Sequence, residues 1–206
     1  FPLGIFAIAI GTVLLPSLSS ANQRGDLTLY KEHLRKSQRL VIFLAIPSVI
    51  GLALCSEHLI SILFQRGEFF YTDVTQASKS LIAFSFGLPF FMMMKVLVPA
   101  FFSRKDTKTP MYAALAALGL NIILNYYFAF TLGYGHIGLA FASSISALLS
   151  SGILYTILVK GNYIQLTSPL NRFNLAVILG SISVILFLIY GPFNINFNSL
   201  SFIDRL

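Results

Sequence analysis

The sequence predicts an all-α membrane protein, a polytopic helical bundle with about six transmembrane helices. Hydrophobic residues make up 56% of the chain and charged residues only 10%, against about 25% charged residues in an average soluble domain. The mean hydropathy is +0.81. The apolar residues also gather in long runs without charge, as transmembrane helices require. These features exclude a soluble globular domain and a disordered chain, which would be polar and rich in charge.

Six apolar runs have lengths suited to crossing a bilayer, whose hydrocarbon core of about 30 Å needs about 20 helical residues. They cover 1–20, 40–55, 80–103, 109–132, 137–159 and 173–190. Only helices fit, because backbone groups in lipid must be bonded within the segment and the runs are too long for barrel strands. The second run is short, so we expect its helix to begin earlier, inside the polar segment that precedes it.

Two segments carry signals of how a helix starts. The stretch 30–40 is basic and amphipathic, with Leu29, Leu34 and Leu40 available to one side. We expect it to lie along the membrane interface before it enters the second span. Thr109 followed by Pro110 predicts a capping hydroxyl and a first-turn proline at the start of the fourth span.

The basic residues predict the orientation of the chain. The connections after the first, third and fifth runs hold ten Lys and Arg residues, whereas the opposite side holds Arg66, Lys79 and Arg205. Cytoplasmic loops carry an excess of Lys and Arg, so the side with ten bases is expected to be cytoplasmic. The ten are Arg24, Lys31, Arg35, Lys36, Arg39, Arg104, Lys105, Lys108, Lys160 and Arg172.

Residues for chemistry are sparse. The chain has seven carboxylates, none inside a predicted span, and it lacks a phosphate-binding glycine loop, a zinc motif and a nucleophile elbow. Its three histidines are far apart, and one cysteine cannot form an internal disulfide. We therefore expect no enzyme, no cofactor and no nucleic-acid partner, and we leave open a coupling ion or the membrane potential.

Lys95 is the one ionisable residue well inside an apolar run, where a charge costs a few kcal/mol. Two interpretations remain open. Its amine reaches the cytoplasmic headgroups by snorkelling, although nine residues, or about 13 Å of helix, separate it from Arg104. Alternatively, the amine faces a cavity and contacts an anionic group of a substrate.

Asn121 and Asn125 lie four residues apart in the fourth run and so share one helix face. They are candidates for the substrate path, although buried amides in membranes more often join helices. The fifth run carries a stripe of small residues at spacing four, which predicts close helix packing. The stripe consists of Gly138, Ala142, Ser146 and Ser150.

Four blocks of sequence follow one another in a distinctive order. Phe-Pro-Leu-Gly at 1–4 leads to Gly-Thr-Val-Leu-Leu-Pro-Ser-Leu-Ser at 11–19, and Leu-Phe-Gln-Arg-Gly-Glu-Phe follows at 63–69. The block 95–110 is the most specific, and Gly-Leu-Ala stands at 138–140. In order and spacing, the blocks resemble the MurJ (MviN) family of lipid II flippases over nearly the whole chain. The motif residues are Pro2, Gly4, Pro16, Gly67, Pro99, Arg104, Asp106, Lys108 and Pro110.

The resemblance implies a fourteen-helix transporter of the MOP superfamily of multidrug and polysaccharide exporters. Such proteins have two six-helix lobes around a central cavity and two carboxyl-terminal helices that border a groove for the lipid tail. They carry the undecaprenyl-linked peptidoglycan precursor across the bacterial cytoplasmic membrane by alternating access. On this mapping, 1–160 holds helices eight to twelve of the carboxyl-side lobe. Residues 161–206 hold a cytoplasmic linker, helix thirteen and the start of the next periplasmic connection.

We expect the chain to be an internal or carboxyl-side piece of a longer protein, with the amino-side lobe, membrane lipids and the lipid-linked precursor as its partners. The family's arginines that hold the pyrophosphate lie mostly in that lobe, so the chain would form one wall of the pathway without them. Two alternatives remain: another exporter of the superfamily, for polysaccharide-lipids or drugs, and a membrane scaffold that does not transport.

Overall fold

The computed structural model describes residues 3–4, 8–164 and 177–183, and these residues form helices and turns without a strand. The all-α fold class is therefore confirmed. The elements are α1 (Ile8–Gln23), α2 (Leu27–Phe64), α3 (Tyr71–Ser85), α4 (Leu88–Phe102), α5 (Lys108–Tyr126), the π-helical turn η2 (Tyr127–Thr131) and α6 (Gly135–Lys160).

Four stretches within the described residues are long and apolar enough to cross a membrane. They are Leu27–Phe64, Tyr71–Phe102, Lys108–Thr131 and Gly135–Lys160. They contain the second and fifth predicted runs and all but the last residue of the third and fourth. Helix α1 has 16 residues; it begins inside the first run and ends three residues after it. Of the sixth run only 177–183 is described, and it is helical. Most of the predicted unit 161–206 therefore lies outside the described residues, and its boundary stays a prediction.

Helix α2 begins well before the second apolar run, as the shortness of that run predicted. It is 38 residues long, and the Asp26 side chain caps it by accepting the Leu29 N–H at 2.9 Å. The prediction that 30–40 lies along the membrane interface is wrong, because this stretch is the first part of α2. Leu34 is fully buried in the protein core whereas Leu40 is 46% exposed, so the two leucines do not form one lipid-facing side.

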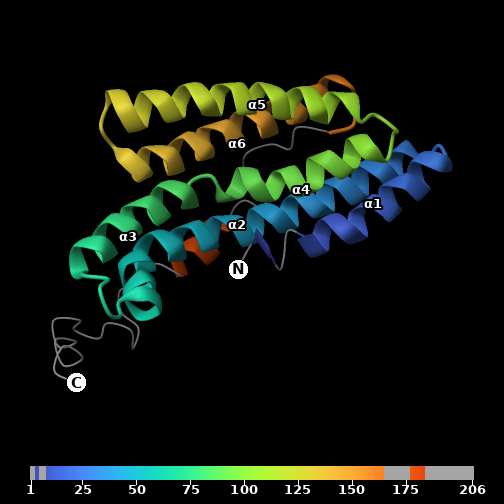
Figure 1. Cartoon of the computed structure of the whole chain (residues 1–206). Helices are drawn as coiled ribbons and strands as arrows, with labels where there is room; N and C mark the ends of the chain where they lie inside the picture. The colour runs from blue at the N-terminus through green and yellow to red at the C-terminus, as the bar shows by residue number, and fades with distance from the viewer. Residues whose placement is uncertain (1–2, 5–7, 165–176, 184–206) are drawn as a thin grey trace.

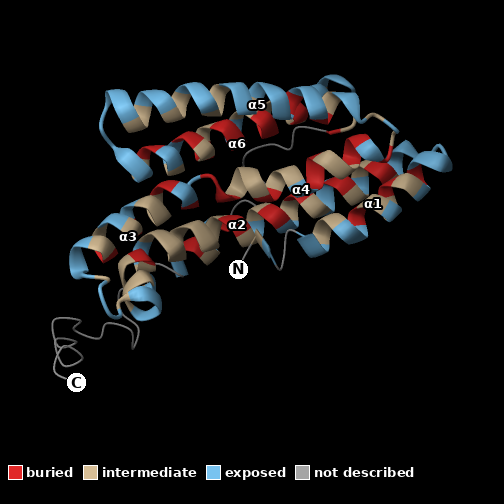
Figure 2. Ribbon diagram, viewed as in Figure 1, coloured by how far each residue is buried: buried red, intermediate tan, exposed pale blue. Residues whose placement is uncertain are grey.

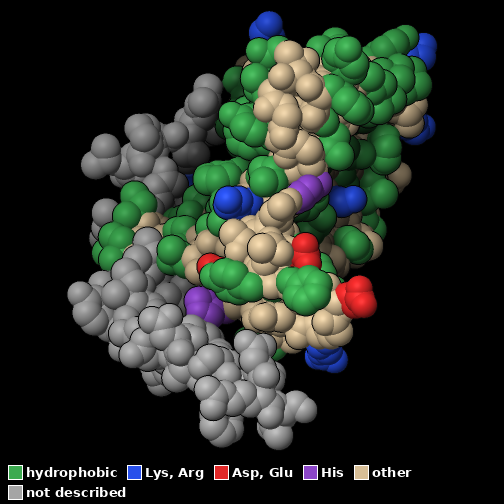
Figure 3. All heavy atoms as spheres, turned by 60° about the vertical axis from the view of Figure 1, so that its left-hand side comes forward, with side chains coloured by type: hydrophobic (Ala, Val, Ile, Leu, Met, Phe, Trp, Pro, Cys, Tyr) green, Lys and Arg blue, Asp and Glu red, His purple; other side chains and the backbone are tan. Residues whose placement is uncertain are grey.

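The helices form two connected groups. Helices α1, α2 and α4 pack against one another, and α5 packs chiefly on α6. Helix α6 also contacts α3 and α4, which join the two groups (Figure 1). Buried residues line α4 and α6, whereas α5 is exposed along most of its length (Figure 2). Figure 3 shows hydrophobic side chains over much of the face that it presents.

The third predicted run is interrupted in the structure. It holds the last part of α3 and all of α4, and these two helices meet at Phe86 and Gly87. The Gly87 N–H donates to the Phe84 carbonyl at 3.0 Å and leaves the Ala83 carbonyl without the usual partner four residues on. The Ser144 hydroxyl of α6 donates to the Ala83 carbonyl at 2.8 Å. A break inside a span is stable when a neighbouring helix satisfies the freed backbone group in this way.

Small residues bring α6 close to its neighbours, and the prediction of close packing is confirmed. All four residues of the stripe are buried. A Cβ added at Gly138 would lie 2.7 Å from the Phe128 Cβ, and one added at Gly87 would lie 2.9 Å from the Ser144 Cα. Both distances are too short for a larger side chain, so glycine permits these two contacts.

Candidate functional site

Lys95 lies on the side of α4 that faces away from most of the core. Its neighbours Val96 and Leu97 are fully buried, whereas Lys95 is exposed. Helix α1 crosses α4 at this point: a Cβ added at Gly11 would lie 3.0 Å from the Lys95 carbonyl oxygen. Gly11 therefore allows α1 to approach the Lys95 backbone closely, and the amine emerges beside that crossing.

A hydrogen bond fixes the depth of Lys95 relative to α2. The Tyr30 hydroxyl donates to the Ala100 carbonyl at 2.6 Å, which places these two residues of the antiparallel helices α2 and α4 at one level. Lys95 precedes Ala100 by five residues and Arg35 follows Tyr30 by five, so each lies about 7.5 Å further along its helix. Lys95 thus shares its level with Arg35 of α2, towards the end of the bundle where α2 begins and α4 ends and not at its middle. The basic residues predict that this end is cytoplasmic.

Residues of the motif block 95–110 join the end of α4 to the end of α1 and the start of α2. The Ser103 hydroxyl lies 3.2 Å from the Tyr30 hydroxyl and donates to the Ala100 carbonyl at 2.9 Å. The Asn22 amide, near the end of α1, donates to the Ser103 carbonyl at 3.2 Å. Tyr30, Ala100 and Ser103 are all buried, so the bonds between α2 and α4 lie in a dry environment. The bond from Asn22 of α1 is partly buried.

The guanidinium of Arg104 packs on two aromatic rings. Its guanidinium carbon lies 4.0 Å from the ring centroid of Tyr163 and 5.0 Å from that of Phe101. Tyr163, which follows α6, also meets Tyr30 edge to face at 5.8 Å. The planar guanidinium stacks well on aromatic rings. Arg104 therefore fastens the segment after α6 to the end of α4.

The connection between α4 and α5 is held by Asp106. Its Oδ1 accepts the Thr109 N–H at 3.0 Å, and its Oδ2 accepts the Thr109 hydroxyl at 2.7 Å. The prediction that Thr109 caps the helix is wrong, because α5 begins at Lys108 and Asp106 is the acceptor. These hydrogen bonds from Thr109 lower the pKa of Asp106 below its usual value. Pro110 lies in the first turn, as predicted, and is buried.

The two asparagines of α5 bond to each other. The Asn125 amide donates to the Asn121 Oδ1 at 2.9 Å, so the bond lies within one helix and does not join two. The Asn125 Oδ1 is buried and has no hydrogen-bond partner among the described residues. Helix α5 packs chiefly on α6 and only slightly on α4. The structure therefore does not bring this pair together with Lys95.

Three of the remaining motif residues lie inside helices or in a turn. Pro16 lies inside α1 and Pro99 inside α4. Gly67 has a φ of +60°, a backbone conformation that favours glycine, in the turn between α2 and α3. A Cβ added at Gly4 would meet nothing within 4 Å. Pro2 lies outside the described residues.

Sequence reasoning missed the buried polar residues that position the helices. They are Tyr30 and Ser103 at this end of the bundle and Ser144 at the junction of α3 and α4. A weak signal existed for Tyr30, which recurs at helical spacing with Leu34, Gln38 and Val41. No group of three or more His, Cys, Asp or Glu that could hold a metal ion occurs in the described part of the chain.

These features define the chain as a polytopic α-helical membrane protein. The sequence model of the family described as "Lipid II flippase MurJ" matches residues 1–204. The chain belongs to this family. It is 46% identical to a probable lipid II flippase MurJ of Vibrio cholerae over 172 residues, 84% of this chain and 32% of that protein. It is 36% identical to the lipid II flippase MurJ of Thermosipho africanus, over 92% of this chain and 36% of that protein.

A solved structure agrees with the fold. It is described as lipid II flippase MurJ in an inward closed conformation, and it matches with a TM-score of 0.75 and 33% identity. The match covers 92% of this chain and 38% of that one. The chain thus spans about a third of the length of the relatives that it matches.

Family membership and four helices of spanning length place the chain in the bacterial cytoplasmic membrane as a multi-pass protein. The family is named for flipping a lipid, which is transport and not a chemical reaction, so the prediction that the chain is not an enzyme is confirmed.

Proposed function

We propose that the protein carrying this chain flips lipid II, the undecaprenyl-linked peptidoglycan precursor, across the cytoplasmic membrane by alternating access. The observation that carries the proposal is the match to the flippase family over residues 1–204. The described chain supplies helices α1 to α6 as one wall of the pathway. An amino-side lobe of the same protein is the partner that completes the cavity.

The physical task of such a protein is to carry a polar, anionic head through hydrocarbon. A disaccharide-pyrophosphate cannot cross alone, because burying its charges and hydroxyls costs many kcal/mol. A hydrated cationic cavity that opens alternately to each side lowers this barrier while the lipid tail stays in the bilayer. The expected motion is rocking of one lobe against the other.

Lys95 is the residue of this chain that we assign to the substrate path. It is exposed beside the crossing of α1 and α4, and it shares the level of Arg35 near the cytoplasmic end. A cation at that level can contact the pyrophosphate as the head group enters from the cytoplasm. Asn121 and Asn125 are weaker candidates, since they bond to each other on a helix that packs chiefly against α6.

Exposure of lipid II at the outer leaflet tests the proposal in cells depleted of their own flippase. The full-length protein is expected to restore exposure and growth, and the isolated 206-residue chain is not. Export of another lipid-linked saccharide or of a drug without lipid II exposure would contradict the proposal.

Two variants test Lys95 in the same cells. Lys95→Gln should lower lipid II exposure several-fold at unchanged membrane abundance. Lys36→Gln is the matched control, because Lys36 is exposed at a similar level of α2 and pairs with Glu32 at 2.6 Å. Equal lipid II exposure in cells with either variant would show that the Lys95 amine only reaches the lipid headgroups.

A further inference from the structure

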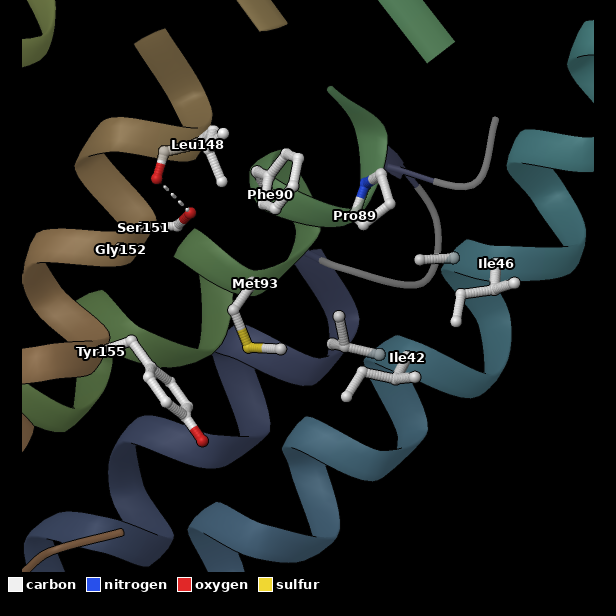
Figure 4. A pocket seen from close by; sticks show the side chains of 11 residues that line it. Ile42, Ile46, Pro89, Phe90, Met93, Leu148, Ser151, Gly152 and Tyr155 are labelled. Atoms are coloured by element: carbon white, nitrogen blue, oxygen red, sulfur yellow. Dashed lines mark hydrogen bonds between the residues drawn. The ribbon is translucent and has the colours of Figure 1, made fainter. Parts of the chain in front are cut away.

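An apolar pocket opens between α2, α4 and α6. Its volume is about 280 Å³, and its lining is almost wholly apolar. Ile42 and Ile46 of α2 face Gly152 and Tyr155 of α6, with Met93 of α4 between them (Figure 4). Both α2 and α6 pack against α4, which forms the floor. A Cβ added at Gly152 would meet nothing within 4 Å, so this glycine leaves the space open.

A polar end adjoins this pocket on its cytoplasmic side. Gln38 precedes Val41 by three residues and Ile42 by four, so it lies on the pocket face of α2, one turn nearer the cytoplasm. It is 9% exposed, and its Nε2 is buried without a hydrogen-bond partner among the described residues. An unsatisfied buried donor is costly, so its acceptor is expected to lie outside the described residues.

Arg35 continues the same face. It precedes Gln38 by three residues and Ile42 by seven, and it is exposed. From the cytoplasm inwards, this face of α2 therefore presents a cation, an amide donor and then two isoleucines, over about 16 Å from Arg35 to Ile46. That order is the order of groups in an anionic lipid of the cytoplasmic leaflet, with the phosphate outermost and an acyl chain inside.

The pocket faces the opposite way from Lys95. Phe90 and Met93 line it from α4, and Lys95 follows Met93 by two residues, about 200° further around the helix. A cation is stabilised when its side of the helix faces water or polar groups, whereas an apolar pocket is stabilised when acyl chains fill it. The two faces of α4 therefore suit two different surroundings, and the pocket suits the lipid.

We infer that this pocket binds a phospholipid with an anionic head group from the cytoplasmic leaflet. One acyl chain fills the space between Ile42, Met93 and Gly152, and the phosphate accepts hydrogen bonds from Gln38 and Arg35. Water is a poor occupant, because an ordered water needs two to four polar partners. Charge complementarity favours the anionic head group, since basic groups between helices on the cytoplasmic side bind such lipids.

Photo-crosslinking of the full-length protein in phosphatidylcholine nanodiscs tests the inference. The probe is phosphatidylglycerol with a diazirine in one acyl chain. Crosslinks are expected within 41–46 of α2 and 148–155 of α6. Gly152→Leu fills the space and should reduce them at least fivefold. Gly119→Leu is the matched control, because a Cβ at this glycine of α5 also meets nothing within 4 Å.

A second pair of variants tests the head group. Arg35→Gln should lower labelling by the phosphatidylglycerol probe several-fold towards that of a phosphatidylcholine probe, and Lys36→Gln should not. Equal labelling of wild type and Gly152→Leu, or equal labelling by both probes in the wild type, would overturn the inference. So would a photoreactive residue at Ile42 that crosslinks to another segment of the same chain or to a prenyl chain. Lipid II flipping is not the readout, so these outcomes leave the proposed function untouched.

Discussion

The hydroxyl of Tyr30 donates to the carbonyl oxygen of Ala100 at 2.6 Å, although the two residues are 70 positions apart in the chain. This contact joins the start of α2 to the end of α4 and sets the register of two antiparallel helices. It also places Lys95 at the level of the bases of α2. Much of the geometry at the cytoplasmic end depends on this pair.

Tyr30→Phe removes that hydrogen bond and keeps the ring against Tyr163. The Ser103 hydroxyl still donates to the Ala100 carbonyl, so we expect a moderate loss of stability, about 1 kcal/mol. The thermal midpoint of the full-length protein in detergent, measured by size-exclusion chromatography after heating, checks this. Tyr112→Phe on the exposed face of α5 is the control and should leave the midpoint unchanged. Equal midpoints for both variants would contradict the role of Tyr30.

Gly87→Ala should destabilise the junction of α3 and α4. The added Cβ would lie 2.7 Å from the Ser144 Oγ and 2.9 Å from the Ser144 Cα, so backbone must move. We expect a loss of about 1–3 kcal/mol, typical of overpacking. Gly119→Ala, in open space on α5, should instead be neutral or stabilising, because alanine favours a helix over glycine. A stable Gly87→Ala protein would show that α6 does not approach this junction closely.

Ser144→Ala should destabilise the same junction for a different reason. Without the hydroxyl, the Ala83 carbonyl loses its donor from α6, at a cost of about 1 kcal/mol. Ser143 is the matched control, since its exposed hydroxyl bonds only the Leu139 carbonyl of its own helix. If Ser144→Ala and Ser143→Ala gave equal thermal midpoints, the hydroxyl would have no part in stabilising the break.

Arg104→Lys should weaken the attachment of the segment after α6 while it conserves the charge. Lysine cannot stack as a plane on the Tyr163 ring, so we expect a loss of about 1 kcal/mol. Lys105→Arg, at the next and exposed position, should have no effect. Limited proteolysis near Tyr163 would report the loosening, and unchanged cleavage in Arg104→Lys would contradict this contact.

Asp106 predicts a pH dependence at acid pH. Its folded-state pKa is lowered by the bonds from Thr109, so its contribution to stability is present above the unfolded value of about 4. The contribution is lost as pH falls through the lower folded-state pKa. The thermal midpoint of wild type should therefore fall below pH 4 more steeply than that of Asp106→Ala. If the thermal midpoints of the two proteins fell in parallel with pH, the hydrogen bonds from Thr109 to Asp106 would not stabilise the protein.

Composition sufficed to predict the membrane helices, because lipid excludes polar groups from long apolar runs. The orientation that the basic residues predict stays a prediction. The predictions were wrong where contacts between distant helices decide the local structure. The break at Gly87 needs Ser144 of α6 to satisfy a carbonyl, and no local pattern reveals a partner about 60 residues away. The stretch 30–40 is amphipathic, but its buried side meets α1 and α4 and not lipid, a choice that periodicity alone cannot make.

The sequence identified candidate site residues by their chemical type, but it did not predict which residues they contact. An isolated cation in an apolar run identified Lys95, yet its depth follows from the Tyr30 contact, which joins two distant helices. The spacing of Asn121 and Asn125 predicted a shared face, and the structure shows that they satisfy each other in part. Arg104 stood out as a motif residue, and its stacking on Tyr163 depends on a segment 59 residues later in the sequence.

The sidedness of the two ends of the bundle is the sharpest test of the proposed function, because a lipid II flippase of this topology must hold its basic end in the cytoplasm. In the full-length protein with Cys55→Ser, single cysteines replace Lys105 after α4 or Glu68 between α2 and α3. A maleimide that cannot cross membranes should label Glu68→Cys in intact spheroplasts, and Lys105→Cys only after permeabilisation. Labelling of Lys105→Cys from outside intact spheroplasts would contradict the orientation and the pathway built on it.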